Sequence, residues 1–186
     1  MIDAGELKKG ITIELDGELY QVVDYQHIKV GRGSAHIRLR LRGIRTGHNI
    51  ERSFQASEKF TQAFLEHRPI QYLYNDDNLY YFMDTESFEQ IPLDKAKLSE
   101  TLDYLKEGLN LEMLTYKGET VGIDLPISIE LQVTDTDPGF KGDTATGGTK
   151  LAKLETGITI QVPLFINVGD VVKVDTRTAA YSERIS

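Results

Sequence analysis

Short segments in which apolar and polar residues alternate, separated by turns, fill most of this 186-residue chain. Residues 36–42 read His-Ile-Arg-Leu-Arg-Leu-Arg, and 127–133 place Ile, Ile, Leu and Val at every second position. Because successive side chains of a strand point to opposite faces, this alternation predicts half-buried strands. Turn pairs such as Asp16-Gly17 and Lys117-Gly118 separate several of them. We therefore expect an all-β fold.

The predicted strands form three sets, each long enough for one small β-barrel. We place the three domains in series at 1–64, 65–126 and 127–186. One helix is predicted, over 94–107, because leucines recur there at i, i+4 and i+7 and Gly108 stands where a C-terminal cap belongs. We expect this leucine stripe to pack in a core.

A basic stretch lies within an otherwise acidic chain. Residues 29–52 hold seven Lys/Arg and one acid, a net charge of +6, whereas the whole chain carries -8. Arg38, Arg40 and Arg42 fall on the outward face of the predicted strand, and Arg45 follows it. Such a row is the footprint expected for a phosphate backbone. The alternative is the solvated face of an ordinary sheet, but the concentration of seven cations favours phosphate.

The basic stretch opens with a glycine-flanked tip, Lys29-Val30-Gly31-Arg32-Gly33. Glycines permit positive φ and remove neighbouring bulk, so Arg32 could project into a narrow space. A mobile hairpin turn that happens to contain an arginine explains the same residues equally well.

Composition narrows the function classes. The chain has no cysteine, so thiolate metal sites and disulfides are excluded. Its four histidines, at 27, 36, 48 and 67, lack metal-binding spacing, and no catalytic motif stands out. We expect no metal and no enzymatic activity. Without a signal-peptide layout or an apolar run of about 20 residues, we also expect a cytoplasmic protein with no membrane association.

Four segments together resemble the bacterial translation elongation factor P family, and the resemblance spans the chain. The stretch 150–169, with its Lys-x-Ala, Val-Pro and closing Gly, is similar to the family's third-domain signature. The tip 29–33 is similar to its first-domain loop. Gly142-Asp143-Thr144 is similar to the loop that reaches the exit-site codon. Tyr181 and Arg184 match a C-terminal Tyr-x-x-Arg.

The resemblance implies an L-shaped, tRNA-like monomer with an SH3-like (KOW-like) barrel followed by two OB folds. It implies a factor without a cofactor that binds both ribosomal subunits between the peptidyl and exit sites. Beside the peptidyl-tRNA, it would promote peptide-bond formation at stalling sequences such as consecutive prolines. The implied sites are the tip with Lys29, Gly31, Arg32 and Gly33, the phosphate contacts Arg38, Arg40, Arg42 and Arg45, the codon loop 142–144, and the RNA contacts Tyr181 and Arg184.

The tip departs from the family pattern at two positions. Arg32 stands where many members carry a modified lysine, and Val30 stands where proline is usual. Arginine at the tip resembles a branch in which a glycosyltransferase rhamnosylates the guanidinium, so rhamnosylation of Arg32 is an expectation.

Two other function classes stay open on the residues alone. A general single-strand RNA-binding OB-fold protein should carry aromatic stacking platforms on its basic face, but residues 29–52 contain no Phe, Tyr or Trp. A hydrolase using paired carboxylates is the other class, and turnover by purified protein without ribosomes would reveal it.

Overall fold

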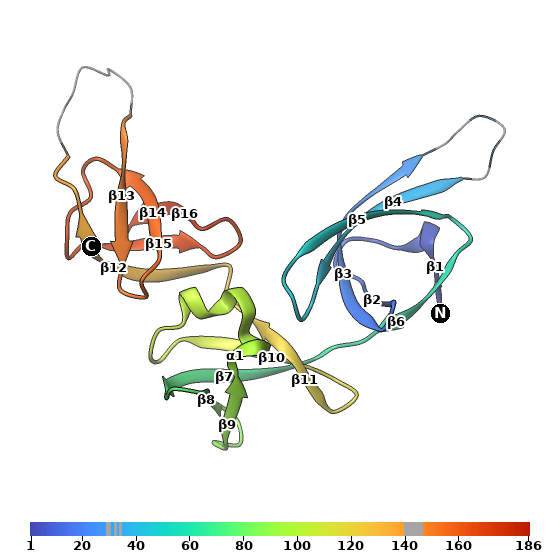
Figure 1. Cartoon of the computed structure of the whole chain (residues 1–186), viewed down its shortest axis with the longest axis horizontal. Coiled ribbons are helices and arrows are strands. Elements are labelled where there is room, and N and C mark those ends of the chain that lie inside the picture. Colours follow the sequence, from blue (N-terminus) through green and yellow to red (C-terminus); the bar gives the residue numbers. More distant parts are fainter. Residues whose placement is uncertain (29–30, 32, 34, 140–146) are drawn as a thin grey trace. The chain divides into compact units, whose positions relative to one another are not determined.

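The computed structural model describes residues 1–28, 31, 33, 35–139 and 147–186. Within these residues, nearly all regular structure is strand, arranged in three sheets (Figure 1). The predicted all-β class is confirmed. Among the described residues, no helix is long and apolar enough to cross a membrane.

The first sheet has six strands in the order β1-β6-β2-β3-β4-β5. Their bounds are β1 Ile2–Asp3, β2 Thr12–Leu15, β3 Glu18–Ile28, β4 His36–Gly43, β5 Asn49–Gln55 and β6 Lys59–Ala63, with the 3-10 turn η1 at Ala4–Glu6. The predicted turn between β2 and β3 is confirmed, because Asp16 and Gly17 both have positive φ, 53° and 81°, as a two-residue hairpin loop needs. The inner face of this sheet is a core that includes Leu7, Ile13 and Phe54.

The second sheet has the order β11-β10-β7-β8-β9. Its strands are β7 Glu66–Asn75, β8 Leu79–Asp84, β9 Gln90–Asp94, β10 Asn110–Tyr116 and β11 Glu119–Asp124. The turn between β10 and β11 again has two positive φ values, 51° at Lys117 and 81° at Gly118. The predicted turn is therefore present here too.

The predicted helix over 94–107 is much shorter than expected. Only α1, Lys95–Leu98, is α-helical, and η2, Ser99–Tyr104, continues as a 3-10 helix. Side chains such as those of Thr101 and Asp103 compete for backbone hydrogen bonds, which disfavours an α-helical interior. Leu98 is buried as expected and Tyr104 is buried as well, whereas Leu102 and Leu105 are half-buried.

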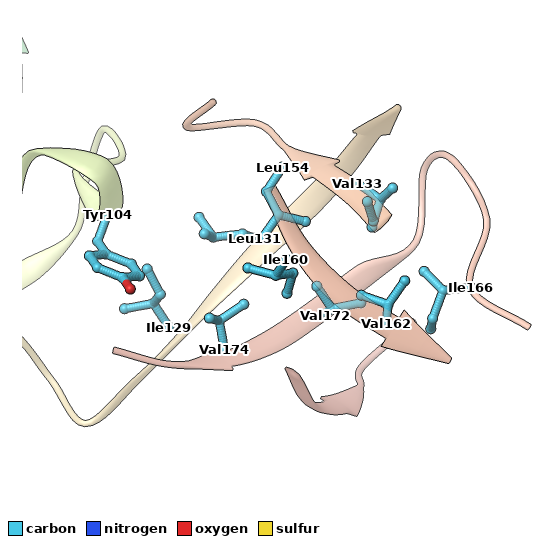
Figure 2. Packing of buried hydrophobic residues seen from close by; sticks show 11 residues of the cluster. Tyr104, Ile129, Leu131, Val133, Leu154, Ile160, Val162, Ile166, Val172 and Val174 are labelled. Atoms are coloured by element: carbon cyan, nitrogen blue, oxygen red, sulfur yellow. The ribbon is translucent and has the colours of Figure 1, made fainter. Parts of the chain in front are cut away.

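The third sheet has the order β14-β13-β12-β15-β16. Its strands are β12 Ser128–Thr136, β13 Thr149–Leu154, β14 Thr159–Pro163, β15 Val171–Asp175 and β16 Ala180–Arg184. Its core consists mainly of aliphatic side chains, and Tyr104 of η2 lies beside Ile129 at one end of the cluster (Figure 2). Ile127, expected on the inner face, precedes β12 and is 63% exposed.

The described chain forms two compact units, and the second sheet is divided between them. One unit comprises Met1–Arg68, Leu93–Glu100 and Met113–Ile123, and the other comprises Pro69–Pro92, Thr101–Glu112 and Asp124–Ser186. Within the first unit, Leu114 and Val121 of the β10–β11 hairpin share a core with Leu19 and Ala63. The domain limits 1–64, 65–126 and 127–186 stay a prediction.

Candidate nucleic-acid interface

Strand β4 separates apolar and cationic side chains as its sequence predicts. Ile37, Leu39 and Leu41 are each 0% exposed. Arg38, Arg40 and Arg42 are all exposed. Because the inner residues are held in the core, the strand presents its arginines as an ordered row on the outer face. We call Arg38, Arg40 and Arg42 the arginine row.

The neighbours of the arginine row come from the two strands that flank β4. Cross-strand partners share a face of the sheet, so each arginine lies between one residue of β3 and one of β5. The partners in β3 are Gln26, Asp24 and Gln21, and those in β5 are Ser53, Glu51 and Asn49. The middle arginine, Arg40, is thus flanked by two carboxylates.

Sequence reasoning missed Asp24 as a neighbour of the row. The register between β3 and β4 would have revealed it, but two features hide that register. Seven residues separate Ile28 from His36, so no tight turn sets the pairing. The pairing also shifts between Val22 and Asp24 at a bulge, which changes the register of the strand along its length.

Ion pairing engages only part of the basic stretch. Arg38 Nε lies 3.5 Å from Glu51 Oε1, and the two side chains are 48% and 60% exposed. Such an exposed pair contributes about 0–1 kcal/mol, so a phosphate could displace the carboxylate. In the part of the chain that the structure describes, Arg40, Arg42 and Arg45 form no ion pair. These three guanidinium groups are open to an external anion.

The seventh cation of the basic stretch is engaged elsewhere. Arg52 of β5 donates from Nη1 to Asp16 Oδ2 over 2.7 Å. Its partner in β4 is Leu39, so Arg52 starts from the face opposite the arginine row. Arg52 is therefore no part of the row, although the composition of 29–52 includes it.

The predicted tip extends from the hairpin that β3 and β4 form. The last pair before the tip is Ile28 with His36. Gly31 has a φ of +43°, and a Cβ added there would meet nothing within 4 Å. The positive φ therefore favours glycine at position 31, because a larger side chain would have room there but would strain the backbone. Lys29 and Arg32 lie outside the described residues, whereas Gly33 is described.

The predicted codon loop, Gly142-Asp143-Thr144, also lies outside the described residues. The strands on either side of it are well joined. Thr136 Oγ1 donates to the Leu151 carbonyl over 2.7 Å, and Lys150 Nζ donates to the Asp137 carbonyl over 2.7 Å. The base from which the loop leaves the third sheet is therefore held by side chains as well as by the β12–β13 ladder.

The two predicted C-terminal RNA contacts have different surroundings. Tyr181 of β16 is half-buried and packs against the third core. Arg184 lies 3.8 Å from Asp170 Oδ2, and its guanidinium is 5.7 Å from the centre of the Phe165 ring. Tyr181 thus has a packing role of its own, whereas half-exposed Arg184 can still reach an external group.

Metal ligands do not gather in the described residues. No group of three or more His, Asp or Glu side chains there is arranged to hold an ion.

Comparison with known proteins gives the chain its family. Three family profiles match in succession: "Elongation factor P (EF-P) KOW-like domain" over residues 3–60, "Elongation factor P (EF-P) OB domain" over 65–123, and "Elongation factor P, C-terminal" over 129–184. Elongation factor P of Moorella thermoacetica is 57% identical over 184 residues, covering 99% of this chain and 100% of that protein. The chain belongs to the elongation factor P family.

Other relatives agree with this assignment. Elongation factor P of Acetivibrio thermocellus is 52% identical over 185 residues, covering the full length of both chains. Among solved structures, eukaryotic translation initiation factor 5A from Methanococcus jannaschii matches with a TM-score of 0.51 and 25% identity, covering 67% of this chain and 90% of that one. The resemblance inferred from the sequence is confirmed, and with it the KOW-like and OB-fold barrels of a translation elongation factor.

Proposed function

We propose that this elongation factor P family member binds the ribosome between the peptidyl and exit sites, in contact with both subunits, and positions peptidyl-tRNA. There it promotes peptide-bond formation at stalling sequences such as consecutive prolines, acting as a monomer in the cytoplasm. Family membership supports the role in elongation. The observation that carries the RNA-binding part is the exposed arginine row on β4, of which only Arg38 is ion-paired among the described residues.

The arginine row holds the first barrel against the phosphates of the tRNA acceptor arm, and Arg45 extends the contact. Phosphate contacts position a protein and read no sequence, which suits a factor that must act on many tRNAs. Because Arg38, Arg40 and Arg42 are anchored by buried neighbours in the same strand, the row has a fixed spacing. Docking by the row sets the direction in which the β3–β4 hairpin carries its tip.

Arg32 then acts at the peptidyl-transferase centre. The proline ring restricts the backbone of the nascent chain, so the reacting groups seldom reach a productive geometry. Ordering the end of the tRNA lowers the entropic cost of reaching that geometry. This needs a permanent charge and several donors, which a guanidinium supplies, and no general base. The ribosome performs the chemistry, and the factor is not an enzyme.

Replacing Arg32 by Ala tests this function directly. Arg32 stands between two glycines in the sequence and apart from the arginine row, so thermal stability and ribosome binding should stay close to those of the unchanged protein. Acceleration of Pro-Pro bond formation should be lost. Single-turnover synthesis of a Pro-Pro peptide on purified ribosomes measures the effect, and a variant that accelerates the reaction at the unchanged rate contradicts the proposal.

Modification of the tip is a separate proposal. We expect Arg32 in protein from its native host to carry a rhamnose, attached by a glycosyltransferase that recognises the tip. The added sugar should block tryptic cleavage after Arg32 and add the mass of one deoxyhexose to the peptide that contains it. Unmodified Arg32 in fully active native protein removes the modification and leaves the effector role standing.

The loop 142–144 has a role at the exit-site codon in this proposal, with Tyr181 and Arg184 supporting contacts to RNA nearby. Changing both Asp143 and Thr144 to Ala should leave the β12–β13 ladder intact and slow the rescue of stalled ribosomes. Toeprinting at Pro-Pro codons measures that rate. If stalls clear as fast as with the unchanged protein, the loop is a connector only.

A further inference from the structure

A polar hollow lies on the outer face of the first sheet, where β3, β4 and β5 run side by side. Its volume is about 240 Å³, and its lining consists of Asp24, Tyr25, Gln26, Arg38, Arg40 and Glu51. The sheet register explains how the charged side chains of the hollow meet, because Arg40 pairs with Asp24 on one side and with Glu51 on the other. The hollow is small beside the roughly 300–1,000 Å³ of a drug-sized ligand site.

The charges of this hollow do not suit a bare phosphate. Two guanidinium groups would attract an anion, but the carboxylates of Asp24 and Glu51 beside them would repel it. A ligand that carries an anion and a hydroxyl donor within a few ångströms satisfies both kinds of group. Guanidinium groups bind phosphate oxygens, and carboxylates accept hydrogen bonds from the 2′-hydroxyl of ribose. A single ribose-phosphate unit of an RNA backbone has this combination.

The groups that line the hollow are free to exchange partners. The Arg38–Glu51 pair is 3.5 Å long and about half exposed, so it is weak. Asp24 Oδ1 accepts a hydrogen bond of 2.9 Å from the Tyr25 N–H, which orients that carboxylate on its strand. Arg40 makes no ion pair with any described residue. A ribose-phosphate unit could therefore engage both arginines while one of the carboxylates accepts from its hydroxyl.

We propose that this hollow is a ribose-selective backbone site, in which Arg38 and Arg40 bind a phosphate and one of the two carboxylates, Asp24 or Glu51, accepts from the adjacent 2′-hydroxyl. The proposal rests on the proposed docking of the arginine row against a tRNA. It adds that the contact distinguishes RNA from other polyanions, because the 2′-hydroxyl is the group by which a protein tells RNA from DNA. The two carboxylates lower the affinity for any polyanion without that hydroxyl.

The test compares two hairpins with the sequence of a tRNA acceptor stem, one of ordinary RNA and one with 2′-fluoro groups in place of the hydroxyls. Both have the same charge and favour the same sugar pucker, but only the first can donate. Fluorescence anisotropy with the full-length protein at low salt should show about fivefold tighter binding of ordinary RNA, the effect of one modest hydrogen bond. Asp24→Asn with Glu51→Gln should bind both hairpins more tightly and reduce the preference below about twofold, since neutral amides accept more weakly.

The matched control is Glu18→Gln with Glu58→Gln, which removes the same charge from exposed positions of the same unit outside the hollow. It should keep the fivefold preference. Equal binding of the two hairpins by the unchanged protein, or a preference that survives in the Asp24/Glu51 variant, overturns the ribose site and leaves phosphate docking standing. Absence of binding to either hairpin overturns both the ribose site and the proposed docking of the row.

Discussion

Strands β4 and β12 both have aliphatic residues on their inner face, but the residues on their outer faces differ in charge. The inner residues are Ile37, Leu39 and Leu41 in β4 and Ile129, Leu131 and Val133 in β12, all of them buried. The outer residues are Arg38, Arg40 and Arg42 in one strand and Glu130, Gln132 and Thr134 in the other. The alternating aliphatic residues place one face of each strand in a core. The outer residues decide what the other face can bind.

The two outer faces also differ in how their polar groups are used. In β12, Gln132 Nε2 donates to the Gly169 carbonyl over 3.3 Å, and Thr134 Oγ1 donates to the Lys153 carbonyl over 3.1 Å. In β4, Arg38 alone of the three arginines has a described ion pair. Two of the three outer residues of β12 thus hydrogen-bond within their own compact unit, whereas the outer face of β4 is open to an external anion.

The largest effect should come from the inner faces, where the strands are alike. Leu39→Ala and Leu131→Ala each remove a side chain that is 0% exposed, so each should lower the free energy of unfolding by about 2–5 kcal/mol. Urea denaturation followed by circular dichroism measures this. A change well short of that range at either position would mean that the core around that strand is looser than its burial indicates.

The next effect should separate the two outer faces. Replacing Arg38, Arg40 and Arg42 together by Ser should weaken ribosome binding and reduce the slope of log affinity against log salt by about one for each phosphate that is no longer neutralised. The matched control changes Glu130, Gln132 and Thr134 of β12 together to Ser and should leave that slope unchanged. Titrations of ribosome binding over a series of salt concentrations measure the slope. If the β4 variant gives the same curves as the unchanged protein, docking by the arginine row is contradicted.

A smaller effect tests the coupling of the β10–β11 hairpin to the first barrel. Glu14 Oε1 accepts from Tyr116 Oη over 2.7 Å and from Lys117 Nζ over 3.0 Å. The Tyr116 hydroxyl and then Lys117 lower the pKa of Glu14 from its ordinary 4.5. The stabilisation this implies is present above pH 4.5 and is lost as the pH falls through the lowered pKa. Tyr116→Phe should therefore lower the melting temperature at neutral pH, with a deficit that narrows in acid.

Melting curves of both proteins from neutral pH down to about pH 3, below the ordinary pKa of a glutamate, measure that deficit. A deficit that stays constant over this range would place the effect of Tyr116→Phe in packing rather than in the hydrogen bond to Glu14.

The smallest effect lies at the end of β15 in the third sheet, where Asp175 and Arg177 form an ion pair. Arg177 donates from Nε to Asp175 Oδ1 over 3.1 Å and from Nη2 to Oδ2 over 2.6 Å. The side-chain hydrogen bonds from Arg177 hold the pKa of Asp175 at about 2, below its ordinary 3.8. Arg177→Gln should raise that pKa toward 3.8 and leave the salt dependence of ribosome binding unchanged. Carbon-detected NMR titration of the carboxyl follows the first effect, and a changed salt slope would show that Arg177 also meets phosphate.

Much of the site could be read from the sequence because it depends on local patterns. Alternation placed Ile37, Leu39 and Leu41 inside and the arginine row outside without any knowledge of the neighbours. The pairs Asp16-Gly17 and Lys117-Gly118 marked their turns because two-residue hairpin loops need positive φ. The helix over 94–107 was predicted too long, since Leu102 and Leu105 fit the helical spacing but Tyr104 took the buried position.

Alternation, turn residues and family-like segments by themselves thus determined the all-β class, the arginine row and the membership in the elongation factor P family. Tertiary structure alone decided which residues stand beside the row. Asp24 and Glu51 flank Arg40 because a long hairpin, a bulge and a second strand pairing set the register, and the register between two strands is not encoded in either strand alone. The register also places Arg52, which belongs to the basic stretch by sequence, on the face opposite the arginine row, where it binds Asp16.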